Sequence, residues 1–278
     1  FVDSCRTCAK CRAGREQYCL GGGKISTYGS PLKYAHLPEY VADRSAVAPG
    51  SKSYATYGGY STRIVVDEAY TLRIPDTLDL AGAAPLLCAG ITTWSPLMFY
   101  GAQADQRIAV AGLGGLGHMA VKFAVALGAH VTVLSRSESK RAEALESLGA
   151  HAFVNTTDPE QVTKVAGAFD LVVDCISAAH DVDMLLRMVT PDGGNVCMVG
   201  LPPEGVQVSS FAFVGPRKML SGSNIGGIRE TQQMLDFCGR HNITCDIEMI
   251  DADYINHAYE RTIKSDVKYR FVIDAATF

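Results

Sequence analysis

Short apolar runs separated by turn residues fill the middle of the chain. Arg107–Ala111 and His130–Leu134 are two such runs, and each predicts a buried strand. Between them, His118–Leu127 has the composition of a helix and ends at Gly128. A strand, a helix and a second strand within about thirty residues form the unit from which parallel sheets are built.

The same alternation continues to residue 222. Asp183–Val189 predicts a helix, and Pro191–Gly194 carries turn residues. Four further apolar runs predict strands at Ala152–Asn155, Asp170–Ile176, Gly194–Gly200 and Lys218–Gly222. Together with the first two strands, they predict an α/β fold with a doubly wound parallel sheet.

A glycine-rich turn joins the first strand to the first helix. We call it the glycine loop, and its residues are Gly112, Leu113, Gly114, Gly115, Leu116 and Gly117. Gly112 permits a tight turn, Gly114 lets the backbone approach a pyrophosphate, and Gly117 lets the helix pack close to the strand. The N-terminus of the helix then faces the phosphates. Because strands flank the loop on both sides, we favour a dinucleotide site over a glycine-rich turn without a ligand.

The residues at the end of the second strand indicate which dinucleotide binds. An NAD site usually has an acidic residue there, which accepts hydrogen bonds from the ribose hydroxyls. The chain has Ser135, which would not repel a 2′-phosphate. Its neighbours Arg136, Ser137 and Lys140 offer donors to that phosphate, and Glu138 is expected to point outward. The pattern favours NADP(H), and a solvated loop with incidental charge is the alternative.

Four cysteines crowd the start of the chain with the spacing Cys5-x2-Cys8-x2-Cys11-x7-Cys19. Two-residue gaps let a tight loop turn its thiolates toward one Zn²⁺, which takes four ligands in a structural site. Because four cysteines fill the coordination sphere, no position remains for a substrate. We expect the metal to supply much of the folding free energy of this polar segment. Disulfides, free thiols and an iron–sulfur cluster are the alternatives.

Composition limits the function further. The 278 residues are 47% hydrophobic and 19% charged with a net charge of -4, and no basic block indicates nucleic-acid binding. No apolar run reaches the roughly 18 residues that span a bilayer, so no membrane is expected. Nine cysteines without the spacing of a disulfide scaffold fit a reducing compartment such as the cytoplasm. The chain starts without Met and without a signal peptide, so we expect residues upstream.

These motifs resemble those of the zinc-dependent medium-chain alcohol dehydrogenases, in the cinnamyl alcohol dehydrogenase-like branch. The resemblance runs nearly end to end. Besides the four cysteines and the glycine loop with His118–Lys122, it rests on Tyr57–Ser61, Ile64–Glu68, Ala84–Thr92 and Asp266–Val272.

The resemblance implies two domains. A dinucleotide-binding Rossmann domain would cover residues 90–224. A mostly β, GroES-like catalytic domain, incomplete at its N-terminus, would comprise residues 1–89 with the structural zinc lobe, and the return segment 225–278. A helix is predicted within that return segment, over Arg229–Cys238. The family also implies a homodimer in which the sixth strands of two sheets pair edge to edge.

The resemblance assigns roles to single residues. Cys88 corresponds to the last protein ligand of the catalytic zinc, although alone it would more often be a buried core thiol. Thr92 corresponds to the hydroxyl beside the nicotinamide. Arg270 corresponds to an arginine that approaches the cofactor, and a surface salt bridge is the alternative. Backbone contacts to the carboxamide edge of the cofactor fall to Val199, Ser223 and Ile225.

The chain departs from the family in two regions. The first two catalytic zinc ligands, a Cys and the His of a Gly-His-Glu motif, lie upstream of the structural zinc lobe in the family and are not in this sequence. Neither is the hydroxyl that starts the proton relay, so only Cys88 of the catalytic metal site is present. Leu20–Ala55 is longer than expected and predicts a loop that shapes the substrate entrance. Trp94, near Cys88, is expected to line that pocket or to pack in the core.

The resemblance implies an enzyme that transfers hydride between NADP(H) and a primary alcohol–aldehyde pair, and an NADPH preference suggests aldehyde reduction. Zn²⁺ would be both structural and catalytic in the complete enzyme, where it would polarise the carbonyl. The sequence does not name the small-molecule substrate. One alternative is a zinc-free quinone or enone reductase, against which the four cysteines and Cys88 argue. The other is a non-catalytic NADP- and zinc-binding paralogue, which the missing ligands support.

Overall fold

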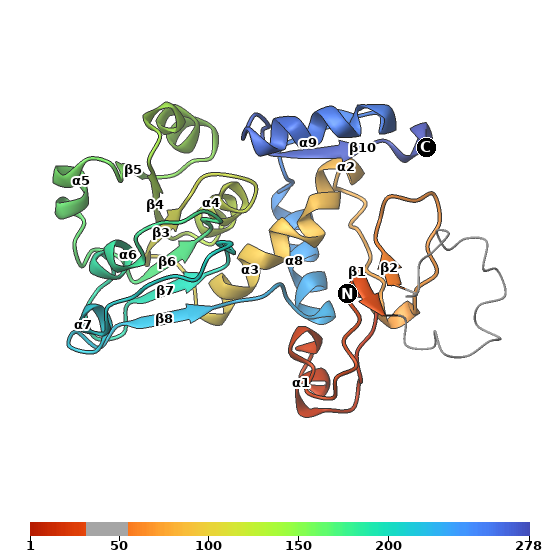
Figure 1. Cartoon of the computed structure of the whole chain (residues 1–278), viewed down its shortest axis with the longest axis horizontal. Coiled ribbons are helices and arrows are strands. Elements are labelled where there is room, and N and C mark those ends of the chain that lie inside the picture. The colour runs from red at the N-terminus through yellow and green to blue at the C-terminus, as the bar shows by residue number, and fades with distance from the viewer. Residues whose placement is uncertain (32–54) are drawn as a thin grey trace.

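The computed structural model describes residues 1–31 and 55–278. Its largest element is a parallel sheet of six strands, on the left of Figure 1. The strands are β3 (Arg107–Ala111), β4 (His130–Ser135), β5 (Ala152–Asn155), β6 (Leu171–Asp174), β7 (Asn195–Met198) and β8 (Met219–Gly222). Their order, β5-β4-β3-β6-β7-β8, reverses direction between β3 and β6. The predicted doubly wound α/β fold is therefore confirmed.

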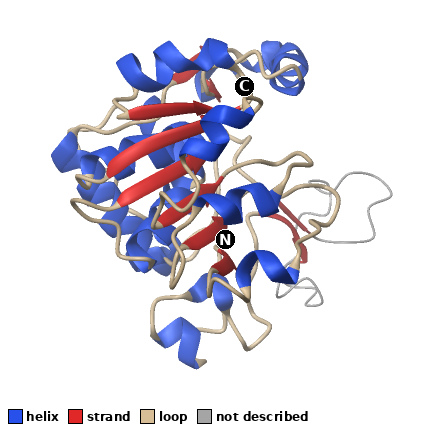
Figure 2. Cartoon of the chain, turned by 90° about the vertical axis from the view of Figure 1, so that its left-hand side faces the viewer, coloured by secondary structure: helices blue, strands red, loops and turns tan. Residues whose placement is uncertain are grey.

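Helices cover both faces of this sheet, whose strands lie side by side in Figure 2. Successive residues of β3 point to opposite faces, so Ile108 and Val110 pack into one buried cluster and Ala109 and Ala111 into the other. Burial on both faces explains why the strands are apolar throughout rather than alternating. The α-helices between residues 89 and 241 are α3 (Ala89–Phe99), α4 (Gly117–Ala126), α5 (Pro159–Lys164), α6 (Val182–Met188), α7 (Ser210–Phe213) and α8 (Ile228–His241).

Several strands are shorter than their apolar runs. The run Asp170–Ile176 gives β6, which ends at Asp174, and β7 is shortened in the same way. The reason is the glycine loop, which ends β3 at Ala111. The Ala111 carbonyl accepts a last bond from the Cys175 N–H at 2.9 Å, and beyond it β6 has no partner on that side. The predicted helices Asp183–Val189 and Arg229–Cys238 correspond to α6 and α8.

The rest of the described chain adds small elements. β1 (Tyr28–Pro31) pairs antiparallel with β2 (Ala55–Tyr57), and β9 (Ile247–Ile250) pairs parallel with β10 (Arg270–Ile273). Residues 32–54, most of the predicted entrance loop, lie outside the described residues. The predicted domain boundaries stay predictions. The remaining helices are α1 (Ala9–Arg12), η1 (Glu16–Tyr18), η4 (Glu68–Tyr70), α2 (Leu80–Ala83), η5 (Ala84–Leu87), η6 (Glu138–Lys140), η7 (Glu143–Ser147), η8 (Ala252–Tyr254), α9 (Ile255–Ile263) and η9 (Ala275–Thr277).

α3 is a core helix and carries Trp94. The Trp94 ring lies 5.3 Å from the Phe123 ring and 4.8 Å from the Phe237 ring, and only 5% of the residue is exposed. Of the two places expected for Trp94, the structure gives the core. Within the described residues no single helix is long and apolar enough to cross a membrane. The bent pair Leu80–Leu87 and Ala89–Phe99 passes that test by length and composition alone.

Candidate cofactor and zinc sites

The glycine loop has the geometry that its sequence predicts. Gly112 has a φ of +85°, a conformation that residues with a Cβ rarely adopt. A Cβ on Gly117 would lie 1.9 Å from the Gly112 carbonyl oxygen, so the start of α4 can approach β3 only without a side chain. A Cβ on Gly114 would meet no atom within 4 Å. Gly112 and Gly117 therefore close the turn, and Gly114 faces open space.

The N-terminus of α4 points its backbone donors at this space. The His118 N–H donates to the Gly114 carbonyl at 3.0 Å, which starts the helix. The N–H groups of Gly115 and Leu116 meet no acceptor in the described part of the chain. Free N–H groups and the positive end of the helix dipole favour an anion such as a pyrophosphate.

Arg270 reaches the glycine loop from β10. A Cβ on Gly115 would lie 2.6 Å from its guanidinium carbon, so the guanidinium lies directly against the loop. Its Nε is buried without a hydrogen-bond partner, and Arg270 forms no ion pair with the residues that the structure describes. The surface salt bridge considered from the sequence is therefore not what the described residues show. A buried, unpaired guanidinium nitrogen beside free N–H groups extends the anion site.

The residues expected at the ribose follow β4. Ser135 is its last residue, 9% exposed, and its Oγ accepts a hydrogen bond from the Ser137 N–H at 3.2 Å. Arg136 and Ser137 are exposed. The Lys140 ammonium instead donates to the Leu113 carbonyl, so it ties this segment to the glycine loop. Its role as a ligand of the 2′-phosphate stays a prediction.

Glu138, the acidic residue that opposed an NADP site, is neutralised by a neighbour. Its carboxylate pairs with the Arg141 guanidinium and accepts a hydrogen bond from the Asn155 amide at 3.3 Å. The Arg141 hydrogen bond holds the pKa of Glu138 below its usual value. The side chain is 55% exposed, as expected, and its charge is balanced rather than aimed at Ser135.

A cavity of about 490 Å³ opens at the carboxyl ends of β7 and β8. Ser223 lines it, whereas Val199 is buried, 6% exposed, between the lining residues Met198 and Gly200 in sequence. Ile225 follows with a φ of 40°, an uncommon backbone conformation for a β-branched residue. The structure thus brings the predicted carboxamide contacts to one edge of the sheet, the edge at which open α/β sheets bind ligands.

Cys88 and Thr92 lie one turn apart at the start of α3. The Thr92 N–H donates to the Cys88 carbonyl at 3.1 Å, and Thr92 is 8% exposed. Cys88 is exposed, so it is not the buried core thiol that the sequence left open. A catalytic zinc site needs three protein ligands. Within the described residues no group of three or more metal-ligand side chains includes Cys88, so these residues do not form a complete catalytic site.

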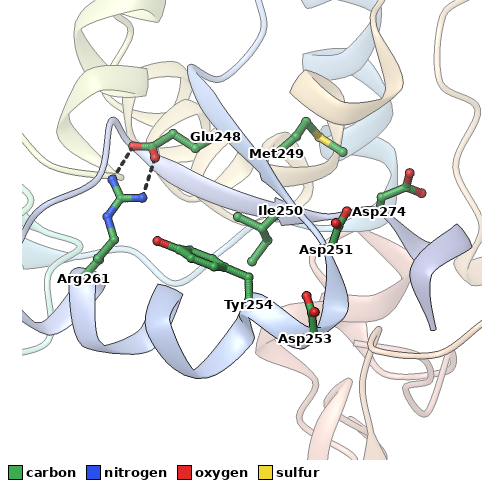
Figure 3. A pocket seen from close by; sticks show the side chains of 8 residues that line it. All are labelled: Glu248, Met249, Ile250, Asp251, Asp253, Tyr254, Arg261 and Asp274. Carbon is green, nitrogen blue, oxygen red and sulfur yellow. Dashed lines mark hydrogen bonds and ion pairs between the residues drawn. The ribbon is translucent and has the colours of Figure 1, made fainter.

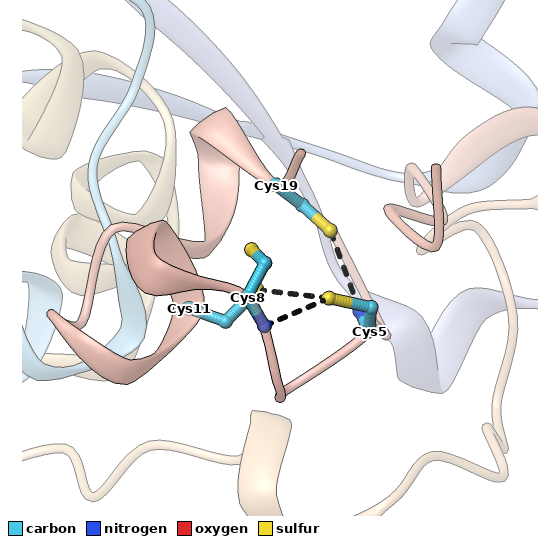
Figure 4. Close-up of side chains that lie close together, drawn as sticks. All are labelled: Cys5, Cys8, Cys11 and Cys19. Carbon is cyan, nitrogen blue, oxygen red and sulfur yellow. Dashed lines mark hydrogen bonds between the residues drawn. The ribbon is translucent and has the colours of Figure 1, made fainter. Parts of the chain in front are cut away.

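The four N-terminal cysteines converge on one point, as Figure 4 shows. Their ligand atoms all lie within 4.8 Å of one another, and the Cys5 and Cys11 sulfurs are 3.9 Å apart. Four sulfurs at about 2.3 Å from a tetrahedral Zn²⁺ stand about 3.8 Å from one another, so the donor set fits zinc. All nine cysteines are free, which excludes the disulfide alternative in this structure.

Backbone donors and glycines shape this site. Three backbone N–H groups donate to the sulfurs, each at 3.4 Å. The Cys8 N–H donates to the Cys5 sulfur, the Cys5 N–H to the Cys19 sulfur, and the Leu20 N–H to the Cys8 sulfur. The Cys8 N–H is the main cause that lowers the pKa of the Cys5 thiol to about 5, which favours the thiolate that metals bind. A Cβ on Gly21 would lie 2.7 Å from the Cys5 sulfur, so the chain passes the site only as glycine.

Two polar contacts, one after β6 and one beside the glycine loop, were not predicted from the sequence. His180 Nε2 lies 2.8 Å from Asp174 Oδ2, and both side chains are almost fully buried. The other Asp174 oxygen accepts a bond from the Ile176 N–H at 3.1 Å, so the pair fixes the loop after β6. An aspartate ending an apolar run was the available signal. The second contact is the stack of the His118 ring on Tyr269 at 4.4 Å, which has no local signal.

A second cavity, of about 430 Å³, lies beside β9 (Figure 3). In it the Arg261 guanidinium is held by the Glu248 carboxylate at 2.8 Å. None of the residues predicted to bind cofactor or metal lines this cavity. We assign it no part in the chemistry.

Comparisons with known proteins agree with this geometry. Residues 115–240 match the family model described as zinc-binding dehydrogenase. The chain is 51% identical to NADP-dependent alcohol dehydrogenase C 1 of Mycolicibacterium smegmatis over 277 residues, which is 100% of this chain and 74% of that protein. It is 46% identical to cinnamyl alcohol dehydrogenase 8 of Arabidopsis thaliana, covering 99% of this chain and 71% of that protein.

Solved structures give the same result. A cinnamyl alcohol dehydrogenase from Sorghum bicolor superposes with a TM-score of 0.90 at 42% identity, covering 99% of this chain and 73% of that one. A Helicobacter pylori enzyme solved in complex with NADP(H) gives a TM-score of 0.85 at 36% identity, again covering 99% and 73%. These identities are high enough to compare site residues as well as the fold.

Proposed function

The chain belongs to the zinc-dependent medium-chain alcohol dehydrogenases, in the branch of the cinnamyl alcohol dehydrogenases, and from this premise we propose that it transfers hydride between NADP(H) and a primary alcohol–aldehyde pair. Aldehyde reduction is the proposed direction, because a preference for NADPH suits a reductase. The observation that carries the proposal is the open space at Gly114 before α4, with Ser135 in place of an acidic residue.

The residues present fit the dinucleotide. The glycine loop would hold the pyrophosphate through its free N–H groups, and the Arg270 guanidinium, which lies against Gly115, would neutralise it. At the end of β4, the side chains of Ser135 and Arg136 would donate hydrogen bonds to the 2′-phosphate. When bound, NADPH supplies the hydride that reduces the carbonyl carbon. NADP dependence is also supported by the name of the M. smegmatis relative and by the NADP(H) complex of the H. pylori enzyme.

At the nicotinamide end of the cofactor, we propose that residues of this chain orient the nicotinamide ring. Backbone groups of Val199, Ser223 and Ile225 would hold the carboxamide edge at the mouth of the cavity after β8. The Thr92 hydroxyl, at the start of α3, would lie beside the nicotinamide. Burial of Thr92 and Val199 keeps water from these positions, which protects a hydride donor from side reactions.

We propose zinc as the ion of the four-cysteine site, where it would tie residues 5–19 together. The four ligand atoms lie within 4.8 Å of one another, as around a single tetrahedral ion, which favours zinc over a multinuclear iron–sulfur centre. Cys88 would contribute a thiolate to the catalytic zinc of a complete enzyme. We derive no catalytic step through that ion, because the described residues do not gather the three protein ligands that it needs around Cys88.

The experiment measures NADPH and NADH oxidation with aromatic and aliphatic aldehydes, in the wild type and in Ser135→Asp. We expect aldehyde-dependent oxidation with a clear preference for NADPH. The introduced carboxylate would repel the 2′-phosphate and reverse the preference by at least about tenfold in kcat/KM. Tight NADPH binding without any aldehyde-dependent oxidation would favour the non-catalytic paralogue. Activity that is indifferent to Ser135→Asp would contradict the proposed ribose site.

A further inference from the structure

The four-cysteine segment packs against the part of the chain that joins the sheet to α8. We call residues 5–19 the zinc lobe, and Ser223–Gly227, between β8 and α8, the β8–α8 connection. More than two hundred residues separate Tyr18 from Asn224 and Glu16 from Ile228 in sequence. In Figure 1 the zinc lobe, with α1, lies beneath the N-terminal end of α8.

Three hydrogen bonds join the zinc lobe to this connection and to the first turn of α8. The Asn224 N–H donates to the Tyr18 hydroxyl oxygen at 3.2 Å. The Ile228 N–H donates to the Glu16 carboxylate at 3.2 Å. The Arg229 guanidinium donates to the Ala13 carbonyl at 2.8 Å. Two of the three therefore hold backbone N–H groups at fixed positions.

The backbones also touch. A Cβ on Gly227 would lie 1.9 Å from the Gly14 carbonyl oxygen, so the two segments approach each other without any side chain between them. Ile225 has a φ of 40°, which a β-branched residue adopts only when its surroundings impose it. The zinc lobe provides contacts on both sides of Ile225, at Asn224 and at Gly227. These contacts, together with the packing of Ile225 against the buried core, fix that conformation.

The same connection lines the cavity at the ends of β7 and β8. Ser223 and Asn224 form part of the cavity wall, and Tyr18 of the zinc lobe forms another part. Tyr18 is 39% exposed, and within the described residues its hydroxyl is the zinc-lobe group that hydrogen-bonds to the connection itself rather than to α8. One hydroxyl therefore links the metal-binding segment to the residues that would hold the nicotinamide carboxamide.

We propose that Tyr18 is a positioning residue that couples metal binding in the zinc lobe to NADP(H) binding at the β8–α8 connection. The proposal rests on the proposed function, because it assigns Ser223 and Ile225 to the cofactor. With zinc bound, η1 holds the Tyr18 hydroxyl under the Asn224 N–H. Without the metal, the lobe loses the tie between its loops, and the connection loses this support.

Coupling of this kind is reciprocal. If the folded zinc lobe favours NADP(H) binding, bound NADP(H) must favour the folded, metal-loaded lobe by the same factor. A single hydrogen bond of ordinary net strength carries a factor of about threefold to tenfold. The metal site therefore reports on cofactor binding without any measurement of activity.

The test is the rate at which an alkylating reagent labels the lobe cysteines in the presence of a chelator, with and without NADPH. Peptide mass spectrometry separates Cys5, Cys8, Cys11 and Cys19 from Cys88, so the catalytic position does not interfere. Tyr18→Phe removes the hydroxyl and keeps the ring. Tyr254→Phe is the matched control, since Tyr254 is 36% exposed but lies in η8, away from the zinc lobe. NADPH affinity is measured on the same proteins by fluorescence.

In the wild type and in Tyr254→Phe, saturating NADPH should slow labelling of the four cysteines about threefold to tenfold. In Tyr18→Phe this protection should disappear, and the Kd for NADPH should rise by a similar factor with the melting temperature nearly unchanged. If Tyr18→Phe binds NADPH and is protected by it like the wild type, the coupling is wrong and the proposed function stands. If the wild type does not bind NADPH, both are overturned.

Discussion

His118 is a buried histidine that must stay neutral. Its Nδ1–H donates to the Gly114 carbonyl at 3.2 Å, and its ring stacks on Tyr269 at 4.4 Å with an interplanar angle of 12°. Nε2 is buried without a partner among the described residues, so a second ring proton would have no acceptor. Burial, followed by the nearby Lys122 charge, lowers the pKa of His118 to about 4.

This pKa predicts a loss of stability in weak acid. In the unfolded chain a histidine takes up a proton near pH 6.5, whereas folded His118 resists it until about pH 4. Between these values the unfolded state binds more protons, so the free energy of unfolding should fall as the pH falls, by up to about 1.4 kcal/mol per pH unit. His118→Phe keeps an aromatic ring on Tyr269 and removes the titration.

Urea unfolding at pH 7.0, 6.0 and 5.0 checks this prediction. Other groups, among them the metal-binding thiols, also titrate, so the difference between wild type and His118→Phe is the informative quantity. His118→Phe should be less stable at pH 7, because it loses the bond to Gly114, and the gap should narrow toward pH 5. A gap that stays constant over this range would contradict the assignment.

At the scale of elements, α8 begins without a capping side chain of its own. Its N-cap residue is Gly227, and the Glu16 carboxylate from the zinc lobe accepts the bond from the Ile228 N–H instead. An acidic group at this end also interacts favourably with the helix dipole. Glu16→Ala should therefore lower the free energy of unfolding by about 1 kcal/mol, and Glu16→Gln by less, because its amide oxygen still accepts the bond.

Denaturant unfolding of the metal-loaded protein measures both changes. Glu160→Ala is the control, since Glu160 is an exposed acidic residue in the first turn of α5. The Asp158 side chain already caps that helix, so this substitution should change stability by only a few tenths of a kcal/mol. Equal effects at Glu16 and Glu160 would show that Glu16 does not act as a cap.

The secondary-structure elements could be predicted from the sequence, but the contacts between distant elements could not. The strands and the glycine loop follow from local patterns, because a buried strand is apolar and a turn against a helix needs Gly112 and Gly117. Contacts between distant segments leave no such pattern. The cap that Glu16 provides to α8 and the stack of His118 on Tyr269 join residues that the chain brings together only when folded. The role of Cys88 came from resemblance alone, since no cluster of three metal-ligand side chains includes it in the described residues.

At the scale of the whole molecule, the proposed cofactor site is assembled from three separate stretches of chain. The glycine loop belongs to the sheet, Arg270 arrives from β10 near the C-terminus, and Tyr18 arrives from the N-terminal zinc lobe. The sheet could be predicted without the other two. The site could not, because the Arg270 contact with Gly115 depends on where the last forty residues return.

The exposed edge strand of the six-stranded sheet, β8, is relevant to the oligomeric state of the protein. β8 is the last strand in the order, and one of its sides has no neighbour in the described chain. Met219 on this strand is 44% exposed, and the nearby Phe211 and Val214 are 88% and 68% exposed. An apolar edge strand is prone to pair with another chain unless it is protected. We propose a homodimer that joins two sheets through β8, in a reducing compartment that suits nine free thiols.

Met219→Lys should weaken this dimer, because a charged side chain on an edge strand opposes pairing and would be buried in the interface. We expect wild type to have the mass of a dimer in light scattering after gel filtration, and Met219→Lys to dissociate with a Kd at least about tenfold higher. Met249→Lys is the matched control, since Met249 is 52% exposed on β9, outside the sheet. NADPH binding should survive in the Met219→Lys monomer, because β6 and β7 separate β8 from β3 and its glycine loop, and Met219 begins β8 at the end opposite Ser223. A monomeric wild type, or equal dissociation in both variants, would rule out this interface while leaving the cofactor site untouched.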